Sequence, residues 1–252
     1  MPVLPGAEPF SHRGGPTAVL LCHGFTGCPQ SLRPWAQYLA EAGLTVSLPR
    51  LPGHGTTWQE MARTGWEDWY AEVERAFDEL RAASDEIFVM GTSMGGCLAL
   101  RLAELHGSEV SGLVLVNPSV TAESRLFLLA PVLKRIVPSL PGLGSDIKKD
   151  GVTELAYDRV PVKAAATLPG LWRITRASLD QVRQPVLIYR SSVDHVVGPA
   201  NLEILRRALP AGQLEVIMCE NSYHVATLDN DAETIFAGSL EFVRAHSHAA
   251  RE

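Results

Sequence analysis

The stretch "EIFVMGTSMGGCLALRLAELHG", residues 86–107, decides the fold. It begins with an apolar run without polar alternation, which is typical of a strand buried on both faces of a parallel sheet. The turn Gly-Thr-Ser-Met-Gly follows at 91–95, and a helical pattern begins directly after it. A G-x-S-x-G turn between a strand and a helix is the setting in which a serine is exposed as a nucleophile. Ser93 is therefore a candidate nucleophile, and the alternative is that it only caps the following helix.

The same alternation of strand and helix continues on both sides of this stretch. Short apolar runs predict strands, mainly interior ones, at 17–22, 44–49, 86–91, 110–117, 185–190 and 214–219. Helical patterns lie between or after them at 31–43, 66–83, 94–107, 199–210 and 231–246. Strands that alternate with helices imply right-handed crossovers. The sequence therefore predicts an α/β fold with a doubly wound, mostly parallel sheet.

One segment interrupts the alternation. Between 118 and 180 there is no clear strand, although several pieces resemble helices, and the stretch 126–143 is rich in leucine and proline. A structureless loop of this length is improbable in a compact domain. We therefore expect a core made of 1–117 and 181–252, with 118–180 inserted as a helical cap. The cap is either additional core or the roof of an apolar ligand tunnel, since pockets favour such junctions.

Composition excludes several classes of protein. The chain has 252 residues, 46% of them hydrophobic, and a formal net charge of -6, which argues against a nucleic-acid partner. No apolar run is long enough to span a bilayer, and the N-terminus does not resemble a signal peptide. The four cysteines have no metal-ligand spacing. Reduced thiols and a cytoplasmic location are the prediction.

A base and an orienting acid follow Ser93 in the chain order that this strand–turn–helix arrangement uses. Asp194 follows the strand predicted at 185–190, and His224 follows the strand predicted at 214–219. Both loops lie at the carboxyl ends of parallel strands, where open α/β sheets bind ligands. His224 would act as general base and Asp194 would orient its ring. His195 is a rival base, but as the neighbour of Asp194 its side chain should point elsewhere.

An oxyanion hole needs two backbone N–H groups that point at one carbonyl oxygen. The first is expected from Met94, the residue after the nucleophile, and the second from Phe25 in "HGFTG" (23–27). His23 is expected to brace this loop. No cluster of histidines and carboxylates has metal-ligand spacing, so neither a metal nor another cofactor is predicted.

Five motifs in this order resemble the α/β-hydrolase superfamily: "HGFTG", "LPGHGT", "GTSMGG", "DHVV" and "NSYHVATLD". Two longer stretches, "SLRPWAQYLAEAGLTVSLPRLPGHGT" and "GSDIKKDGVTELAYDRVP", resemble more narrowly the bacterial monoacylglycerol lipases and small carboxylesterases. With "VLPGAEPF" at the start, the resemblance covers nearly the whole chain. The triad motifs specify the superfamily, whereas the stretch in the cap points to the lipases.

This resemblance implies hydrolysis of a monoacylglycerol to glycerol and a fatty acid through an acyl-serine intermediate. It implies Ser93, Asp194 and His224 as the triad, the Phe25 and Met94 N–H groups as oxyanion hole, and Glu154 of "ELAY" as the contact for the glycerol head. A solvated helix charge is the alternative for Glu154. A general carboxylesterase or a non-catalytic binding protein on the same scaffold are the alternative functions.

The leucine-rich cap also raises the hypothesis of peripheral contact with a membrane or micelle, from which a lipid substrate would enter. Lys134, Arg135, Lys148 and Lys149 could favour anionic headgroups, although such charges usually belong to a solvated face.

Overall fold

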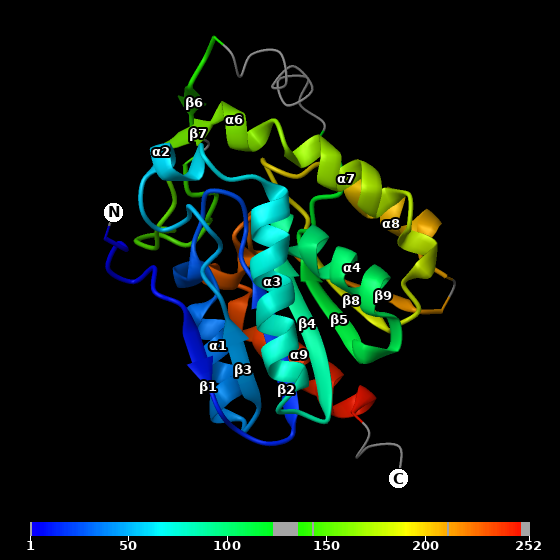
Figure 1. Cartoon of the computed structure of the whole chain (residues 1–252). Coiled ribbons are helices and arrows are strands. Elements are labelled where there is room, and N and C mark those ends of the chain that lie inside the picture. The colour runs from blue at the N-terminus through cyan, green and yellow to red at the C-terminus, as the bar shows by residue number, and fades with distance from the viewer. Residues whose placement is uncertain (1, 123–135, 143, 211, 248–252) are drawn as a thin grey trace.

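The computed structural model describes residues 2–122, 136–142, 144–210 and 212–247. In this part of the chain a seven-stranded sheet has the order β1-β3-β2-β4-β5-β8-β9, and every pair is parallel except β1 with β3 (Figure 1). The strands are β1 (Phe10–His12), β2 (Thr17–Cys22), β3 (Thr45–Leu48), β4 (Glu86–Thr92), β5 (Gly112–Val116), β8 (Val186–Ser191) and β9 (Leu214–Cys219). The predicted doubly wound sheet is confirmed.

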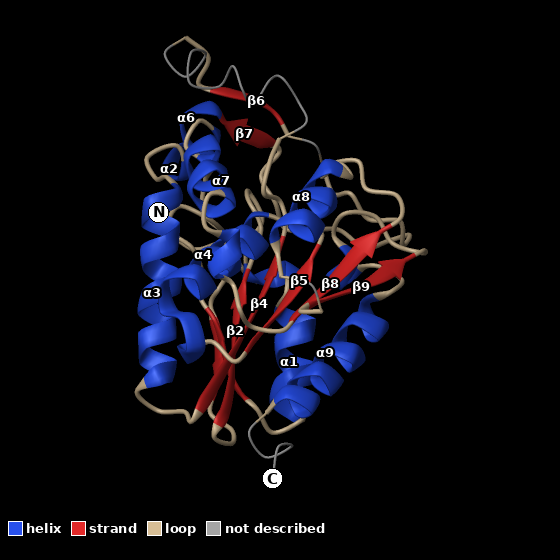
Figure 2. Cartoon of the chain, turned by 90° about the vertical axis from the view of Figure 1, so that its right-hand side faces the viewer, coloured by secondary structure: helices blue, strands red, loops and turns tan. Residues whose placement is uncertain are grey.

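Helices cover both faces of the sheet. They are α1 (Arg33–Glu41), α2 (Trp58–Met61), α3 (Trp66–Arg81), α4 (Met94–His106), α6 (Val162–Ala165), α7 (Leu168–Arg176), α8 (Ala200–Ala208) and α9 (Ala232–His246). Figures 1 and 2 show α1 and α9 on one face and α3, α4 and α8 on the other. Short 3₁₀ helices lie at Pro29–Ser31, Gly107–Glu109, Leu179–Gln181 and Ala226–Leu228.

Strand periodicity divides the interior into two cores. In β2, Leu20 points to the core beneath α3 and α4, whereas its neighbours Val19 and Leu21 point to the core beneath α1 and α9. Trp69 anchors the first core and Trp35 the second, and both are completely buried. Because β2 packs on both faces, its carboxyl end at Cys22 is enclosed between two well-packed cores.

The sheet differs from the sequence-based expectation at its edges. β9 is an edge strand in the described sheet, and its residue Met218 is 44% exposed, although the apolar run predicted an interior strand. The N-terminal strand β1 was not predicted, because three residues carry too little periodicity to be recognised.

The segment 118–180 contributes no strand to the main sheet in its described part. It carries α6 and α7 above the carboxyl ends of the strands (Figure 2). The expectation that it contains no strand is wrong, since β6 (Ser139–Pro141) pairs with β7 (Arg159–Pro161). Each has three residues and includes a proline, which hid the pattern. Most of the leucine-rich stretch, including Lys134 and Arg135, lies outside the described residues.

Candidate active site

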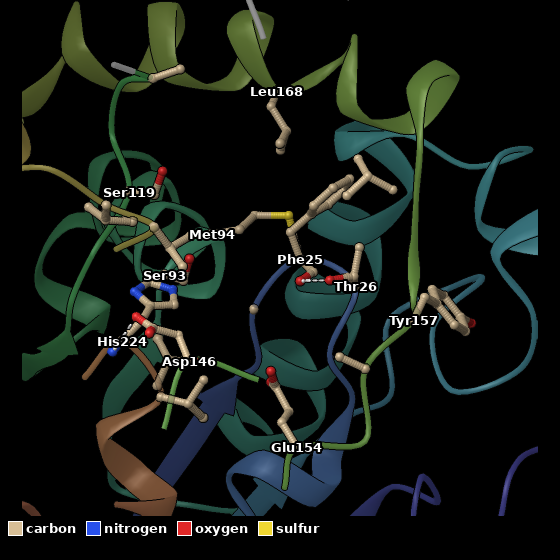
Figure 3. A pocket seen from close by; sticks show the side chains of 18 of the residues that line it. Phe25, Thr26, Ser93, Met94, Ser119, Asp146, Glu154, Tyr157, Leu168 and His224 are labelled. Atoms are coloured by element: carbon tan, nitrogen blue, oxygen red, sulfur yellow. Dashed lines mark hydrogen bonds between the residues drawn. The ribbon is translucent and has the colours of Figure 1, made fainter. Parts of the chain in front are cut away.

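Ser93 occupies a strained turn between β4 and α4. Its φ is 52° and its ψ is -120°, a conformation that residues with side chains rarely adopt. The turn is fixed by hydrogen bonds from the Ser93 N–H to the Val116 carbonyl (3.0 Å) and from the Gly96 N–H to the Ser93 carbonyl (3.1 Å). The Ser93 hydroxyl makes no capping hydrogen bond to α4, so the helix-cap alternative is wrong. The strained turn leaves the hydroxyl facing the pocket (Figure 3).

Glycines make this turn possible because there is no space for a side chain at these positions. A Cβ atom on Gly91 would collide with the Gly95 carbonyl, and one on Gly95 would collide with the Cys22 carbonyl. On the opposite side, a Cβ on Gly24 would lie only 3.4 Å from the Ser93 Cβ. The backbone at Gly24 therefore lies close to Ser93, as the predicted oxyanion loop requires.

His224 and Asp194 form the pair that the chain order predicts. The His224 Nδ1 lies 3.0 Å from the Asp194 Oδ2, and the Asp194 side chain is completely buried. In Figure 3 the His224 ring lies beside Ser93 at the wall of the pocket that both residues line. The other nitrogen of the ring is thus free of the carboxylate and available to the serine side of the site.

The Asp194 carboxylate is ionised by its surroundings. It accepts hydrogen bonds from the N–H groups of Val196 (2.9 Å) and Val197 (2.8 Å) and from the Arg190 guanidinium (2.8 Å). Burial alone would raise its pKa, but the hydrogen bond and charge of His224, with the two backbone N–H groups, lower the pKa below its ordinary value. An ionised carboxylate orients the His224 ring and stabilises its protonated form.

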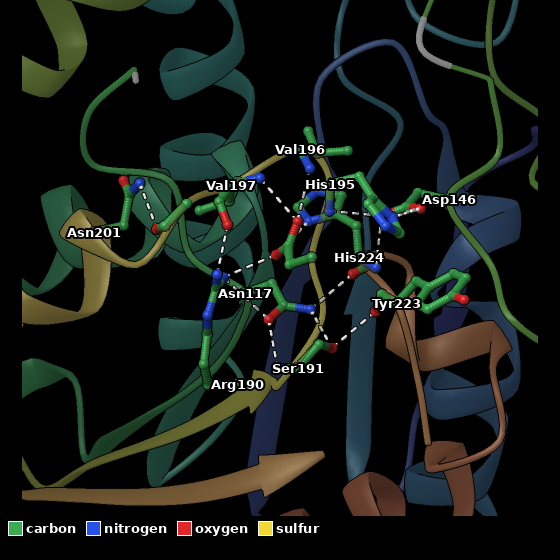
Figure 4. Close-up of polar contacts among 12 residues, drawn as sticks. Asn117, Asp146, Arg190, Ser191, His195, Val196, Val197, Asn201, Tyr223 and His224 are labelled. Carbon is green, nitrogen blue, oxygen red and sulfur yellow. Dashed lines mark hydrogen bonds and ion pairs between the residues drawn. The ribbon is translucent and has the colours of Figure 1, made fainter. Parts of the chain in front are cut away.

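A buried amide that the sequence did not predict connects these loops. Asn117 follows β5 with a φ of 46° and is 1% exposed. Its amide nitrogen donates to the Ser191 hydroxyl and to the His224 carbonyl, each at 2.9 Å, and its amide oxygen accepts from the Ser191 N–H at 2.9 Å (Figure 4). The sequence signals were polar residues at the ends of apolar strands, Asn117 in "VLVN" and Arg190 in "VLIYR".

The predicted oxyanion loop, residues 23–27, is braced by His23, as expected. The His23 Nε2 accepts from the Leu51 N–H (3.1 Å), and its Nδ1 lies 3.0 Å from the Gly24 carbonyl. Burial lowers the pKa of His23 to about 4, so the ring is neutral at pH 7. Its role is to hold the loop through these two hydrogen bonds. Next along this loop is Phe25, whose ring packs against Trp69. The other expected donor, the Met94 N–H, lies in the first turn of α4, where N–H groups have no helical acceptor.

The pocket at Ser93 is apolar along one wall and polar at one end (Figure 3). Its apolar lining includes Phe25, Met94, Tyr157, Val160, Leu168 and Trp172, most of them from α7 or the segment before it. Its carboxylates are Asp146 and Glu154, both from the segment 144–157, which we call the return segment. A long apolar wall with few polar groups suits an acyl chain with a polar head.

Glu154 is not the solvated helix charge of the alternative interpretation. It lies outside any helix and is partly buried beside Gly27, where an added Cβ would lie 2.6 Å from its Oε1. Burial raises the pKa of Glu154 above its ordinary value, against the opposing influence of His224 and of the Ser31 hydroxyl. The glycine thus leaves room for a carboxylate that faces the pocket.

His195 is not part of the triad geometry. Its Nδ1 lies 2.7 Å from the Asp146 Oδ1, its side chain is 59% exposed, and its ring meets the edge of Tyr223. Among the described residues, no group of three histidines, cysteines or carboxylates could hold a metal ion. The four cysteines are buried and unpaired.

Comparison with known proteins identifies the family of the chain. Residues 16–231 match the family described as "Serine aminopeptidase, S33", and the chain belongs to this family, within the α/β-hydrolase superfamily. The chain is 45% identical to a thermostable monoacylglycerol lipase of Bacillus sp. (strain H-257), with 98% of each chain covered. It is 27% identical to a carboxylesterase of Bacillus subtilis (strain 168), with 94% of this chain and 96% of the relative covered.

Solved structures give the same result for the fold. A structure from a study of two metagenome-derived lipolytic enzymes superposes with a TM-score of 0.94 at 43% identity, over 97% of this chain and 100% of the other. A monoacylglycerol lipase of Paleococcus ferrophilus superposes with a TM-score of 0.77 at 22% identity, over 95% and 100% of the two chains. At that identity the likeness concerns the fold.

Proposed function

We propose that this protein hydrolyses monoacylglycerols to glycerol and a fatty acid. The observation that carries the proposal is the Glu154 carboxylate in the wall of the apolar pocket that also contains Ser93 and His224. A carboxylate accepts hydrogen bonds from glycerol hydroxyls, while the apolar wall receives the acyl chain. The 45% identity to a monoacylglycerol lipase over nearly the full length of both chains supports this substrate class.

In the proposed mechanism, His224 takes the proton of the Ser93 hydroxyl while the oxygen attacks the ester carbonyl carbon. The N–H groups of Phe25 and Met94 stabilise the negative charge on the carbonyl oxygen. The tetrahedral intermediate then collapses, and His224 returns the proton to the departing glycerol oxygen. Water, activated by the same ring, attacks the acyl-serine and releases the fatty acid. Asp194 remains ionised throughout and stabilises the imidazolium.

We also propose that the segment 118–180 is a cap that selects the substrate. Leu168 and Trp172 of α7 line the pocket above Ser93, so the chain inserted between β5 and β8 contributes much of the apolar wall. The core units 1–117 and 181–252 would then supply the chemistry, and the cap would determine which acyl chains fit.

The first test compares hydrolysis of monoacylglycerols with that of a short p-nitrophenyl ester. We expect Ser93→Ala to abolish both activities. Glu154→Gln should raise KM for monoacylglycerols and leave the aryl ester nearly unchanged, whereas Asp150→Asn, at an exposed carboxylate of the same segment, should change neither. If Glu154→Gln has no selective effect and aryl esters are preferred, the protein is a general carboxylesterase.

A fluorophosphonate probe separates hydrolysis from mere ligand binding. Wild type should be labelled covalently, and Ser93→Ala should not. If wild type resists the probe, a non-catalytic binding protein on this scaffold is the better account.

We further propose a cytoplasmic enzyme that contacts lipid surfaces through its cap. The Lys148 and Lys149 side chains are exposed on the return segment, while their N–H groups bind the Asp229 carboxylate at 2.7 and 2.9 Å. No described helix has the length and apolar character needed to cross a bilayer. Binding to anionic vesicles should weaken as salt rises and weaken further when both lysines become glutamine. If wild type and the double lysine variant are recovered equally in the supernatant at low salt, the proposal is wrong.

A further inference from the structure

One carboxylate of the return segment lies between the loop of the proposed acid and the loop of the proposed base. Asp146 is largely buried, with 13% of its side chain exposed, and it also lines the pocket. Its Oδ2 accepts the N–H of His195, the residue after Asp194, at 3.2 Å. The same oxygen accepts the N–H of His224 at 3.1 Å (Figure 4). A single oxygen atom thus joins the backbones that carry Asp194 and His224.

We propose that Asp146 is a positioning residue that holds the acid and base loops in register. The inference rests on the proposed roles of Ser93, Asp194 and His224 and extends the machinery to a residue of the inserted segment. The Asp146 side chain binds two backbone N–H groups and the His195 ring. It acts by fixing two backbones, and through them the 3.0 Å contact between Asp194 and His224.

The carboxylate can act as a rigid support because its own backbone is fixed to the same loop. The Asp146 carbonyl accepts the Val225 N–H at 3.1 Å, which fixes the return segment beside the base loop. Further along the return segment, the N–H groups of Lys148 and Lys149 bind Asp229, which also accepts the Tyr223 N–H at 2.9 Å. The return segment is therefore anchored at Asp146 itself and again at the two residues Lys148 and Lys149.

The two oxygens of Asp146 have different surroundings, which gives the proposal a sharp test. Oδ1 faces the His195 ring, which is 59% exposed, and contacts of such exposed side chains contribute little. Oδ2 makes both backbone contacts. In Asp146→Asn the amide oxygen can still accept both N–H groups, and the amide nitrogen can donate to the His195 ring. Asp146→Ala removes both acceptors, and His195→Ala removes only the ring.

The experiment measures kcat and KM for p-nitrophenyl butyrate, which needs no glycerol contact, and the rate of labelling by a fluorophosphonate. We expect Asp146→Ala to lower kcat and the labelling rate about 10-fold or more, with KM changed less than about twofold, since small misplacement of catalytic groups reduces rate steeply. Asp146→Asn and His195→Ala should each retain about half of the wild-type rate or more. Asp150→Asn is the control for an exposed carboxylate of the same segment.

Folding is controlled by circular dichroism and thermal unfolding of each variant. If Asp146→Ala does not fold, Asp146→Ser replaces it, because a serine hydroxyl is too short to reach both N–H groups. The proposal is overturned if the Ala or Ser variant labels as fast as wild type. It is also overturned if Asp146→Asn or His195→Ala loses as much as the Ala variant, since charge or the ring would then be responsible. Failure of wild type to label at Ser93 would instead remove the proposed function itself.

Discussion

Gly27 offers a way to move Glu154 without changing its chemistry. Replacing Gly27 by alanine adds one methyl group, whose carbon would lie 2.6 Å from the Glu154 Oε1 and 3.5 Å from its Cδ. Ordinary van der Waals contact begins near 3.4 Å, so the carboxylate oxygen must move by about 0.8 Å. The backbone of Gly27 has no positive φ, so alanine fits the loop itself.

The displacement is large compared with the tolerance of a hydrogen bond. A contact of about 2.9 Å that lengthens by about 0.8 Å leaves the hydrogen-bonding range. A hydrogen bond to a charged group contributes about 2 kcal/mol, which corresponds to about 30-fold in kcat/KM. We therefore expect Gly27→Ala to lower kcat/KM for monoacylglycerols about 30-fold and that for p-nitrophenyl butyrate less than about threefold.

A double-mutant cycle checks the cause. With Glu154→Ala in place, the methyl group has space, so adding Gly27→Ala should change monoacylglycerol hydrolysis little. Equal losses on both substrates would mean that the methyl group disturbs the oxyanion loop. Additive losses in the cycle would refute the reasoning that Gly27 acts through Glu154.

Three further predictions concern stability. Because burial raises the pKa of Glu154, its ionised form destabilises the fold at neutral and higher pH. Glu154→Gln should therefore raise the melting temperature at pH 8. Calorimetry should find no gain below pH 4, where the wild-type carboxyl is protonated as well. Gly95→Ala should lower the free energy of unfolding, measured in urea, by more than about 4 kcal/mol or prevent folding, because the added Cβ meets the Cys22 carbonyl. Gly151→Ala, at an exposed position, should lower it by only about 1 kcal/mol, because its φ of 75° is unfavourable for alanine. Asn117→Gly should lower the free energy of unfolding by about 3 kcal/mol, because three hydrogen bonds are lost. Asn117→Ala should lower it by about 1 kcal/mol more, because alanine, unlike glycine, is strained at a φ of 46°.

The sequence predicted what depends on local pattern and chain order. Strand 86–92, its turn and its helix follow from periodicity and glycine spacing within one short stretch. Asp194 and His224 could be placed because the carboxyl ends of parallel strands share one edge of the sheet. The 3.0 Å contact between the two side chains agrees with that placement.

The contacts that support this pair could not be predicted in the same way. Asn117 meets Ser191 and His224 across 74 and 107 residues of chain, and Asp146 meets His224 across 78. Such pairs depend on how loops pack, for which periodicity carries no information. The strands β6 and β7 were missed for a related reason, since each is three residues long and is defined only by its partner.

The return segment has a consequence for the exchange of parts between related enzymes. Beyond its contacts with the base loop, its Tyr157 hydroxyl donates to the Gly53 carbonyl at 2.7 Å, and its Leu155 N–H donates to the Gln30 side chain at 2.9 Å. A chimaera that replaces 118–143 keeps all of these hydrogen bonds. A chimaera that replaces the whole of 118–180 breaks them, unless the donor also supplies the matching loops. Swaps that alter acyl preference should therefore keep 144–157 in place and exchange either 118–143 or the later stretch that carries Leu168 and Trp172.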